Sequence, residues 1–546
     1  MDFKKELLNS LTKQIKEQIT LEVPPNLALG DFALPTFKLS KKPPELQKSL
    51  KFPKFIKKTE IKGPYLNFFI KKQVLVETTI KEVLKQKEKY GYNNKGKNKV
   101  ITIDMSSPNI AKPFGIGHLR STIIGNSIAN ISKKLGYKVI KINYLGDWGT
   151  QFGKLIAGYK YFGNKELLKK DSIKHLLEIY VKVNQDPVLE EEGRQWFKKL
   201  EEGNKEALKL WKQFKDLSIK EFNKIYKILN VEFDVISGES LYNKKMNAIV
   251  KELKEKNLLE ESEGALVVNL EKYNLGVSLI QKTDGTSLYA TRDIALAIDR
   301  YKNYKPINMI YEVGAEQKLH FKQFFKILEL MGNQWAKDCT HVDHGLYLDQ
   351  DGKKFATRKG KTVFMIDILN ETIELAKKTI QEKNPNLKNK DEAARKIAIG
   401  AIFYGDLKNT RTHDLVFDIN KFLEFEGNTG PYLQYTYARA SSILRKSNKI
   451  SSKTRIREVN EKELALIKTI SQFPNTIENA YTQLAPHIIA NYTFQLAQNF
   501  NEFYHACPIL NQIKEIKESR LLIVRATTQT LANALSLLGI EVLEEM

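Results

Sequence analysis

The sequence has very little cysteine and no long apolar run. Cys339 and Cys507 are its only cysteines, so they exclude a disulfide framework and a structural zinc site built on paired cysteines. No stretch approaches the ~20 apolar residues that a membrane-spanning helix requires. Residues 1–20 mix bases with acids and lack an apolar centre, unlike a secretory or organelle leader. We therefore expect a cytoplasmic protein without a membrane segment.

Arginine and acidic residues are scarce beside lysine. Only 13 of the 88 basic residues are arginine, and 64 acidic residues leave a formal net charge of +24. Such an excess favours an anionic partner such as a nucleic acid, although lysines spread over a solvated surface would give the same count. A hydrophobic content of 42% excludes a wholly disordered chain. The length of 546 residues corresponds to about three to four domains.

The chain divides into regions of different pattern. Residues 1–90 combine amphipathic helices with a strand-and-turn segment, which predicts a small α+β domain. The polar, glycine-bearing stretch 90–99 is typical of a linker. From about residue 367 the pattern is almost entirely helical, so residues 367–546 are expected to form an all-α domain.

The central region, residues 100–366, has an α/β pattern. An apolar strand at 100–104 is followed by a glycine-bearing loop, a helix at about 118–135 and a second strand at 139–143. This βαβ unit predicts a Rossmann-like parallel sheet with its ligand at the carboxyl ends of the strands. A helical insertion is expected at about 165–260. Further strands of the same sheet are expected at these segments: 264–270, 307–314 and 340–348.

The loop after the first of these strands is a candidate anion site. Gly115 and Gly117 allow close approach of a phosphate, and the following helix directs its free N–H groups and positive dipole end toward that point. His118 could donate a hydrogen bond to a phosphoryl oxygen, and Lys112 adds positive charge. The glycine pair alone would equally suit a tight turn.

Candidate ligands for a cation lie at other strand ends. Asp104 ends the first strand, where an aspartate can also serve only as a cap. Tyr289 and Asp293 are four residues apart, so on a helix they share a face and could hold a planar cation by stacking and a forked ion pair. A surface salt bridge is the alternative. Gln317 follows another predicted strand and could line the same pocket.

Three other segments carry polar or basic clusters. Asp147, Trp148 and Gln151 follow the second strand and are either a pocket wall or a satisfied turn. The loop 351–361 is rich in lysine and could close over a polyphosphate, or be a solvated basic turn. The Cys, His and Asp residues of 339–344 alternate along a predicted strand, so we predict no metal site there.

Taken together, the motifs resemble the arginyl-tRNA synthetases, a family of class I aminoacyl-tRNA synthetases, over essentially the full length. SSPNIAKPFGIGHLRST is similar to the HIGH signature, and KKFATRKG stands in place of KMSKS. The other matching segments follow in family order: GDFALP, NYLGDWGTQFGKL, YATRD, VGAEQKLHF, FLEFEGNTGPYLQYTYAR and NFNEFYHACPIL. Eight matching segments in family order make an accidental resemblance improbable.

The resemblance implies that ATP activates arginine to arginyl-adenylate, and that the arginyl group then moves to tRNA-Arg. It implies an N-terminal domain that contacts tRNA, a helical anticodon-binding domain, Mg²⁺ shared among the phosphates, and a monomer. By the same likeness, the arginine ligands would be Asp104, Ser107, Asn109, Tyr289, Asp293 and Gln317. The ATP ligands and catalytic groups would be Lys112, Gly115, Gly117, His118, Arg358 and Lys359.

The chain departs from the family pattern at two places. Gly115 stands where the commonest HIGH form has its first histidine, and the KMSKS-like loop begins with Phe355, Ala356 and Thr357. These departures leave open which cation of that loop acts on the phosphates, with Lys359 preferred over Lys354. A class I synthetase for another amino acid and a catalytically idle RNA-binding relative remain the alternatives.

Overall fold

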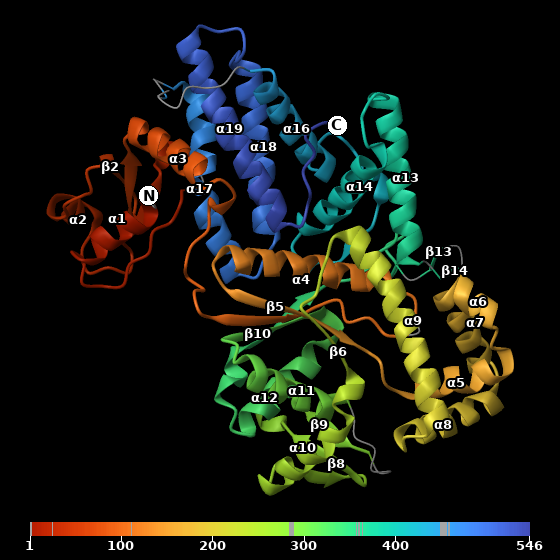
Figure 1. Ribbon diagram of the computed structural model, residues 1–546. Coiled ribbons are helices and arrows are strands. Elements are labelled where there is room, and N and C mark those ends of the chain that lie inside the picture. Colours follow the sequence, from red (N-terminus) through yellow and green to blue (C-terminus); the bar gives the residue numbers. More distant parts are fainter. Residues whose placement is uncertain are drawn as a thin grey trace.

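The computed structural model describes residues 3–546, apart from 25, 111, 283–288, 356, 359–360, 363, 448–455 and 457–458. A parallel sheet occupies the middle of the molecule, with helices α13–α19 on one side and a small domain at the N-terminus (Figure 1). The α/β class with an α+β N-terminal domain and a helical C-terminal domain is confirmed.

The N-terminal domain is a three-stranded antiparallel sheet with helices. The strand order is β1-β3-β2, and Leu7, Leu34, Leu66 and Phe68 lie in its apolar core. The first helix ends at Thr12, earlier than the apolar spacing up to residue 20 predicts. Its elements are α1 (Phe3–Thr12), β1 (Phe32–Pro35), α2 (Pro43–Ser49), β2 (Ile56–Lys62), β3 (Tyr65–Ile70) and α3 (Lys72–Gln86).

The central sheet is fully parallel, with strand order β11-β10-β4-β5-β6. The chain passes from β4 to β5 on one side and returns to β10 on the other, so β4 marks the point where the strand order reverses. Ligands of open α/β sheets bind at the carboxyl ends of strands beside such a point. The strands are β4 (Val100–Asp104), β5 (Lys138–Leu145), β6 (Val235–Gly238), β10 (Asn308–Gly314) and β11 (Cys339–His344).

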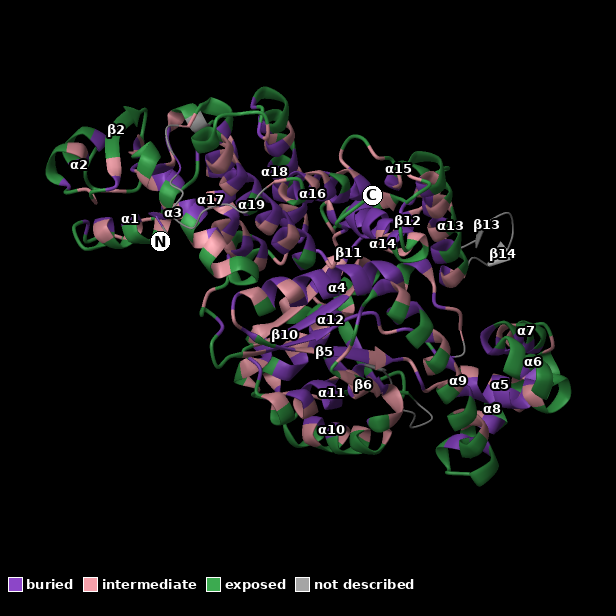
Figure 2. Cartoon of the chain, turned by 45° about the horizontal axis from the view of Figure 1, so that its top comes forward, coloured by how far each residue is buried: buried purple, intermediate pink, exposed green. Residues whose placement is uncertain are grey.

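Helix α4 (Ile116–Lys134) lies between this sheet and the helical domain (Figure 1). Gly125 allows close packing, because a Cβ there would come within 2.5 Å of the Met105 side chain. Almost the whole helix is buried, as are the central strands, whereas the outer helices of the insertion are largely exposed (Figure 2). The start of α4 is therefore held from both sides.

The segment between β5 and β6 is helical. Asn164, Asp171, Asp186 and Asn204 each cap the helix that follows by accepting hydrogen bonds from its first N–H groups. The helices are α5 (Thr150–Phe162), α6 (Lys165–Lys170), α7 (Ser172–Asn184), α8 (Pro187–Glu201) and α9 (Lys205–Leu229). Strand β6, which follows them, lies within the range that the sequence assigns to the insertion and forms the edge of the central sheet.

The expected strand at 264–270 does not join the central sheet. It forms β8 in a separate antiparallel sheet of order β7-β8-β9. The sequence pattern predicts that a segment is a strand but not which strand it pairs with. Here the connections to β7 and β9 are short, which favours pairing with these neighbours in the chain. The elements of this half are α10 (Asn243–Glu255), β7 (Glu260–Ser262), β8 (Ala265–Asn269), β9 (Val277–Gln281), α11 (Tyr289–Tyr304) and α12 (Lys318–Leu330).

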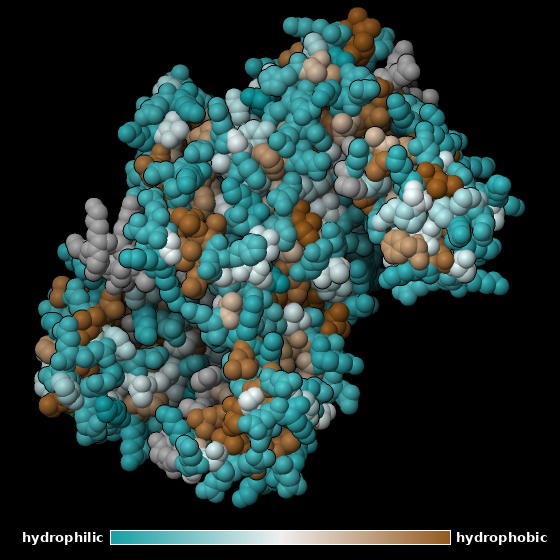
Figure 3. Space-filling view, turned by 180° about the vertical axis from the view of Figure 1, so that it is seen from behind, coloured by the Kyte–Doolittle hydropathy of each residue, from teal (hydrophilic) through white to brown (hydrophobic). Residues whose placement is uncertain are grey.

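The C-terminal part is a helical bundle joined to the sheet by short strands. The strands are β12 (Tyr347–Leu348), β13 (Thr357–Arg358), β14 (Lys361–Thr362) and β15 (Leu415–Val416). The helices are α13 (Met365–Lys383), α14 (Lys390–Leu407), α15 (Ile419–Phe422), α16 (Gly430–Arg445), α17 (Glu461–Thr482), α18 (His487–Ala506) and α19 (Lys514–Leu537). From behind, most of the surface is hydrophilic, with scattered apolar patches (Figure 3). None of the described helices is long and apolar enough to cross a membrane.

Candidate active site

The loop after β4 has an unusual backbone that its neighbours hold in place. Ser106 and Ser107 both have positive φ, at 71° and 47°. The Ser106 N–H donates to Ser121 Oγ of α4 at 2.9 Å, and the Ser107 N–H donates to Asn143 Oδ1 of β5 at 3.2 Å. Non-glycine residues in this region store strain, which is often found at functional sites. The loop therefore presents its side chains in one fixed arrangement at the sheet edge.

His118 lies in the first turn of α4 and has a defined orientation. The Gly115 N–H donates to His118 Nδ1 at 3.1 Å. Burial lowers the pKa of His118 to about 4, and the charges of His344 and Lys112 act in the same direction. The imidazole is therefore neutral near pH 7 and carries its proton on Nε2. That atom can donate to an anion at the helix N-terminus.

Gly115 and Gly117 leave space at the helix start without needing a special backbone. Gly115 has φ −84°, which every residue adopts, and a Cβ there would lie 3.7 Å from His118 Nδ1. A Cβ on Gly117 would meet nothing within 4 Å. The open space fits the approach of a phosphate, whereas the backbone conformation gives no reason for glycine.

Lys112 reaches the same region from the loop. Its Nζ lies 5.7 Å from the ring centre of Tyr180 in α7, and the residue is half-buried. Its charge affects His118, so the structure brings Lys112 and His118 together as the sequence predicts. The insertion thus forms one wall beside the anion site.

Asp104 has an internal partner. Its Oδ2 lies 2.7 Å from Nη2 of Arg300 in α11, and both side chains are almost fully buried. Ser107 Oγ donates to Asp104 Oδ1 at 3.3 Å. The carboxylate that the sequence assigns to a substrate guanidinium is therefore already engaged by a guanidinium of the chain.

Three further predicted arginine ligands are Asp293, Gln317 and Asn109, of which Asp293 acts electrostatically on Asp104. Asp293 Oδ2 lies 2.8 Å from His320 Nε2 of α12, and its charge acts on Asp104. Gln317 and Asn109 are both exposed, in the turn before α12 and in the loop after β4. Tyr289 begins α11 as expected, but its side chain lies outside what the structure describes.

Glu239, which the sequence gives no signal for, joins these carboxylates. It follows β6, and Arg292 Nη1 lies 3.7 Å from its Oε2. Burial raises the pKa of Glu239 to about 7; Arg292 opposes this shift, and the charges of Asp293 and Asp147 reinforce it. No motif or residue spacing in the sequence identifies Glu239 as a site residue. It lies at this edge because β6 pairs with β5, which is a contact between distant segments of the chain. Carboxylates that repel one another at a sheet edge suit a cationic ligand.

Asp147 has a structural role in its turn. It is fully buried, its Oδ2 lies 2.5 Å from Lys215 Nζ, and its Oδ1 accepts from the Ser240 N–H at 2.8 Å. It therefore ties the end of β5 to α9 and to the segment after β6. Of the two interpretations of this cluster, the satisfied turn fits Asp147.

The KMSKS-like loop is described only in part. Lys354 is exposed, with its Nζ 3.1 Å from Glu316 Oε1. Arg358 belongs to β13, which pairs with β14, and its side chain is outside the described part of the chain. Lys359 is itself among the residues that the structure does not describe.

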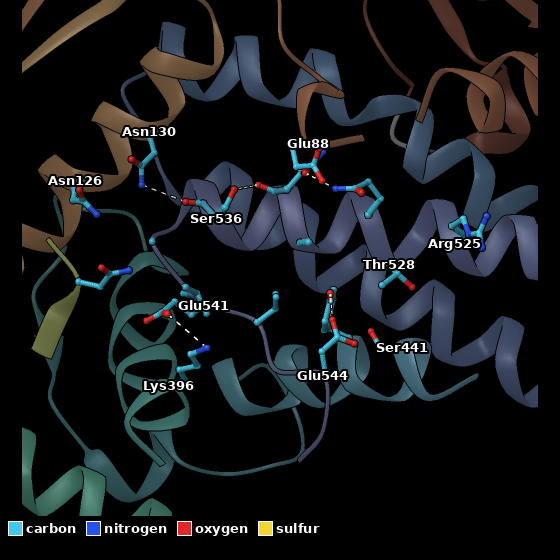
Figure 4. Close-up of a pocket in the computed structure, with 18 of the residues that line it drawn as sticks. Glu88, Asn126, Asn130, Lys396, Ser441, Arg525, Thr528, Ser536, Glu541 and Glu544 are labelled. Carbon is cyan, nitrogen blue, oxygen red and sulfur yellow. Dashed lines mark hydrogen bonds and ion pairs between the residues drawn. The ribbon is translucent and has the colours of Figure 1, made fainter. Parts of the chain in front are cut away.

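A groove of about 1080 Å³ lies elsewhere, between α4, α16, α19 and the C-terminal segment (Figure 4). Its polar groups largely pair with one another: Asn130 donates to the Ser536 carbonyl at 3.2 Å, and Lys396 Nζ lies 3.8 Å from Glu541 Oε1. None of the predicted site residues lines it. The candidate chemistry is therefore at the sheet edge and not in this groove.

Sequence comparison gives the family. The profile described as "tRNA synthetases class I (R), catalytic domain" matches residues 79–419, which is more than half of the chain. The chain belongs to the arginyl-tRNA synthetases. The "Arginyl tRNA synthetase N terminal domain" matches residues 2–70 of this synthetase, and the "DALR anticodon binding domain" matches residues 433–546.

Relatives cover the synthetase from end to end. It is 47% identical to the arginine–tRNA ligases of Clostridium kluyveri and Clostridium botulinum strain Alaska E43, over 100% of each chain. Arginyl-tRNA synthetase from Plasmodium falciparum has 25% identity and a TM-score of 0.83, over 100% of this chain and 98% of that one. The Thermus thermophilus enzyme, at 24% identity, covers 100% and 99% with a TM-score of 0.87 and supports the fold.

Proposed function

We propose that the site activates arginine with ATP, giving arginyl-adenylate and pyrophosphate, and then transfers the arginyl group to tRNA-Arg. The proposal rests on one observation: a group of carboxylates and a helix N-terminus with a neutral histidine lie at the same edge of the sheet. A group of carboxylates around Asp293 and Glu239 suits a cation, and the neutral imidazole of His118 at a helix N-terminus suits a phosphate. This is the pairing that adenylation of a cationic amino acid needs.

Asp293 and Glu239 are the proposed acceptors for the substrate guanidinium. A guanidinium presents a planar fork of donors that a carboxylate matches with two hydrogen bonds. Asp104 would act through Arg300 and through the negative charge that it adds nearby. Tyr289, the first residue of α11, is the proposed aromatic partner that would stack on the guanidinium plane. The polar groups of Ser107, Asn109 and Gln317 would meet the amino and carboxylate ends of arginine.

ATP is expected at the start of α4. The free N–H groups near Gly115 and Gly117, the Nε2–H of His118 and the ammonium of Lys112 would hold the phosphates. Arg358 and Lys359 would stabilise the charge that develops on pyrophosphate as the arginine carboxylate attacks the α-phosphate. Catalysis then consists of orientation and electrostatic stabilisation, with no covalent intermediate on the protein.

Mg²⁺ is proposed to arrive with ATP. The described residues contain no group of three or more His, Cys, Asp or Glu side chains able to hold a metal by themselves. The phosphate oxygens of ATP would therefore supply most of its ligands, as is common for this hard, strongly hydrated cation. We further propose that the enzyme is cytoplasmic and monomeric. Light scattering of the purified protein would give its molar mass and so test the monomeric state.

Pyrophosphate exchange measured with each amino acid, with and without total tRNA, tests the function. Exchange with arginine and with no other amino acid is the expected result. Exchange with another amino acid would favour a different class I specificity. Absence of exchange and of tRNA charging under both conditions, with tRNA binding retained, would favour an idle RNA-binding relative.

A further inference from the structure

Five buried polar residues lie behind the first turn of α4, and we call them the Arg120 cluster. Its members are Arg120, Glu312, His344, Tyr347 and Asp406, and each is at most 7% exposed. Arg120 comes from α4, two residues after His118. Glu312 and His344 lie near the ends of β10 and β11, and Asp406 comes from α14 of the helical part. The cluster thus joins three layers of the molecule at the base of the proposed phosphate site.

The contacts of the cluster form one arginine–aspartate ion pair and one hydrogen-bonded histidine–glutamate pair. Arg120 Nε lies 3.4 Å from Asp406 Oδ2, and its Nη1 donates to the Leu346 carbonyl at 3.2 Å. The Tyr347 hydroxyl donates to Asp406 Oδ2, while its ring lies 5.3 Å from the Arg120 guanidinium. His344 Nδ1 lies 2.8 Å from Glu312 Oε1. Arg120 and Asp406 therefore compensate each other's charge, and the Glu312 carboxylate contacts the His344 ring.

Stability alone does not account for these pairs. Among the described residues, Arg120 Nη2, Glu312 Oε2 and Asp406 Oδ1 are buried without a hydrogen bond. Such unsatisfied atoms cost free energy, and a buried ion pair often gains nothing over apolar residues of the same volume. A cluster with this cost in the core is better explained by the geometry that it fixes.

The cluster is connected to the surroundings of His118 in two ways. Ser121, which follows Arg120 on α4, donates to the Glu312 carbonyl at 2.9 Å and accepts from the Ser106 N–H of the β4 loop. Burial lowers the pKa of His344, but the charge and hydrogen bond of Glu312 outweigh it, so the pKa lies above its usual value. When His344 is protonated, its charge lowers the pKa of His118 and favours the neutral form of that imidazole.

We propose that the Arg120 cluster positions the first turn of α4, and through it the Nε2–H of His118, for adenylate formation. Its members are positioning residues that touch neither ATP nor arginine. The inference rests on the proposed role of His118 in binding phosphate. Because Asp406 belongs to α14, it also makes the alignment of the phosphate site depend on how the helical part packs against α4.

Two conservative changes test the cluster while keeping its volume. Tyr347→Phe removes only the hydroxyl that reaches Asp406, and Glu312→Gln removes only the charge beside His344. Ser127→Ala is the matched control, because Ser127 is a fully buried residue of α4 that donates to the Leu537 carbonyl of α19 at 2.9 Å. It removes a contact between α4 and the helical bundle nine residues beyond His118.

Single-turnover adenylate formation is measured with saturating ATP and arginine, with tRNA present, below the thermal midpoint of every variant. We expect a loss of about 3- to 10-fold for Tyr347→Phe and about 10- to 100-fold for Glu312→Gln, with Ser127→Ala within about 2-fold of the parent. In a His118→Ala background the two cluster changes should cost less than about 2-fold further, because residues that act as a unit are not additive.

The outcomes separate the two proposals. If His118→Ala is slow and the cluster changes multiply its defect in full, the cluster does not act through His118 and this inference is overturned. If His118→Ala forms adenylate as fast as the parent, the phosphate role of His118 fails and the inference fails with it. If the loss of adenylate formation follows the loss of thermal stability in every variant, including Ser127→Ala, the cluster is purely structural. That result would also overturn the inference.

Discussion

Arg300 and Asp104 form a buried ion pair at the carboxyl end of the central strand, with Nη2 2.7 Å from Oδ2. The synthetase thus carries a guanidinium of its own beside the carboxylates proposed to bind the guanidinium of its substrate. The Arg300 guanidinium also lies 5.5 Å and 5.6 Å from the ring centres of Tyr144 and Tyr311. This packing buries Asp104, whereas the contacts of the other two carboxylates are looser or uncharged: Glu239 lies 3.7 Å from Arg292 Nη1, and Asp293 contacts the His320 ring. Asp293 and Glu239 are therefore the carboxylates that we propose for the ligand.

Asp104→Asn is therefore expected to damage stability first. Removing one partner of a buried pair leaves the other charge uncompensated, which costs about 3 to 5 kcal/mol. Urea denaturation should show that loss. Asp299→Asn on α11, the helix that carries Arg300, serves as the control, because Asp299 pairs with the half-exposed Lys245 and should change stability by under ~1 kcal/mol. A stable Asp104→Asn protein with a raised KM for arginine alone would instead restore Asp104 as a direct ligand.

Asp293→Asn should impair arginine use far more than ATP use. The amide keeps the shape of the side chain but loses the charge that a guanidinium requires, at a cost on the order of 2 to 5 kcal/mol. KM values for arginine and ATP in pyrophosphate exchange give the comparison. Citrulline, which replaces the guanidinium by a neutral urea, provides a second measure: the variant should discriminate less against it. An unchanged KM for arginine would contradict the assignment.

Glu239 predicts a pH dependence of arginine recognition. Its pKa is raised to about 7, so the carboxyl loses its proton as pH rises from 6 to 8 and gains the charge that attracts the substrate. KM for arginine should fall across this range, and Glu239→Gln should flatten the dependence. The free enzyme should behave oppositely in stability, because a raised carboxyl pKa adds stability at low pH that is lost as pH rises toward 7. An identical pH profile in wild type and Glu239→Gln would exclude this role.

The sequence predicted the β4–α4–β5 unit well because its signals are local. Gly136 follows the helix end and has φ +84°, so the stop signal there has a direct steric cause. His118 and Lys112 lie together as expected, since both belong to one loop and one helix start. Contacts between residues far apart in the chain could not be predicted. Nothing in the sequence indicates that Arg300 pairs with Asp104, or that Glu239 lies near Asp293.

The lysine excess predicts steeply salt-dependent tRNA binding. Lysines facing phosphates release counterions, so neutralising about four phosphates gives a log–log slope near −3. Lys57 and Lys62 on β2 are exposed on the N-terminal domain and are candidates for such contacts. Replacing both by alanine should make the slope shallower by about one to two units, whereas a flat plot for the parent enzyme would indicate that the charge only solvates the surface.

Gly115 stands at the start of α4, where substitutions test whether the phosphate site is complete without a second histidine. A side chain at this position meets no backbone strain, because φ −84° suits any residue, and a Cβ would lie 3.7 Å from His118 Nδ1. The N–H that orients His118 belongs to the backbone, so Gly115→Ala keeps it and should slow adenylate formation by less than ~3-fold. His118→Ala removes the preorganised donor and should cost at least ~100-fold. Gly115→His places an imidazole beside the His118 ring and should be neutral or mildly harmful in transient kinetics. A large gain from Gly115→His would mean that the phosphate site lacks a donor as it stands, and that His118 with the helix N-terminus is not sufficient for catalysis.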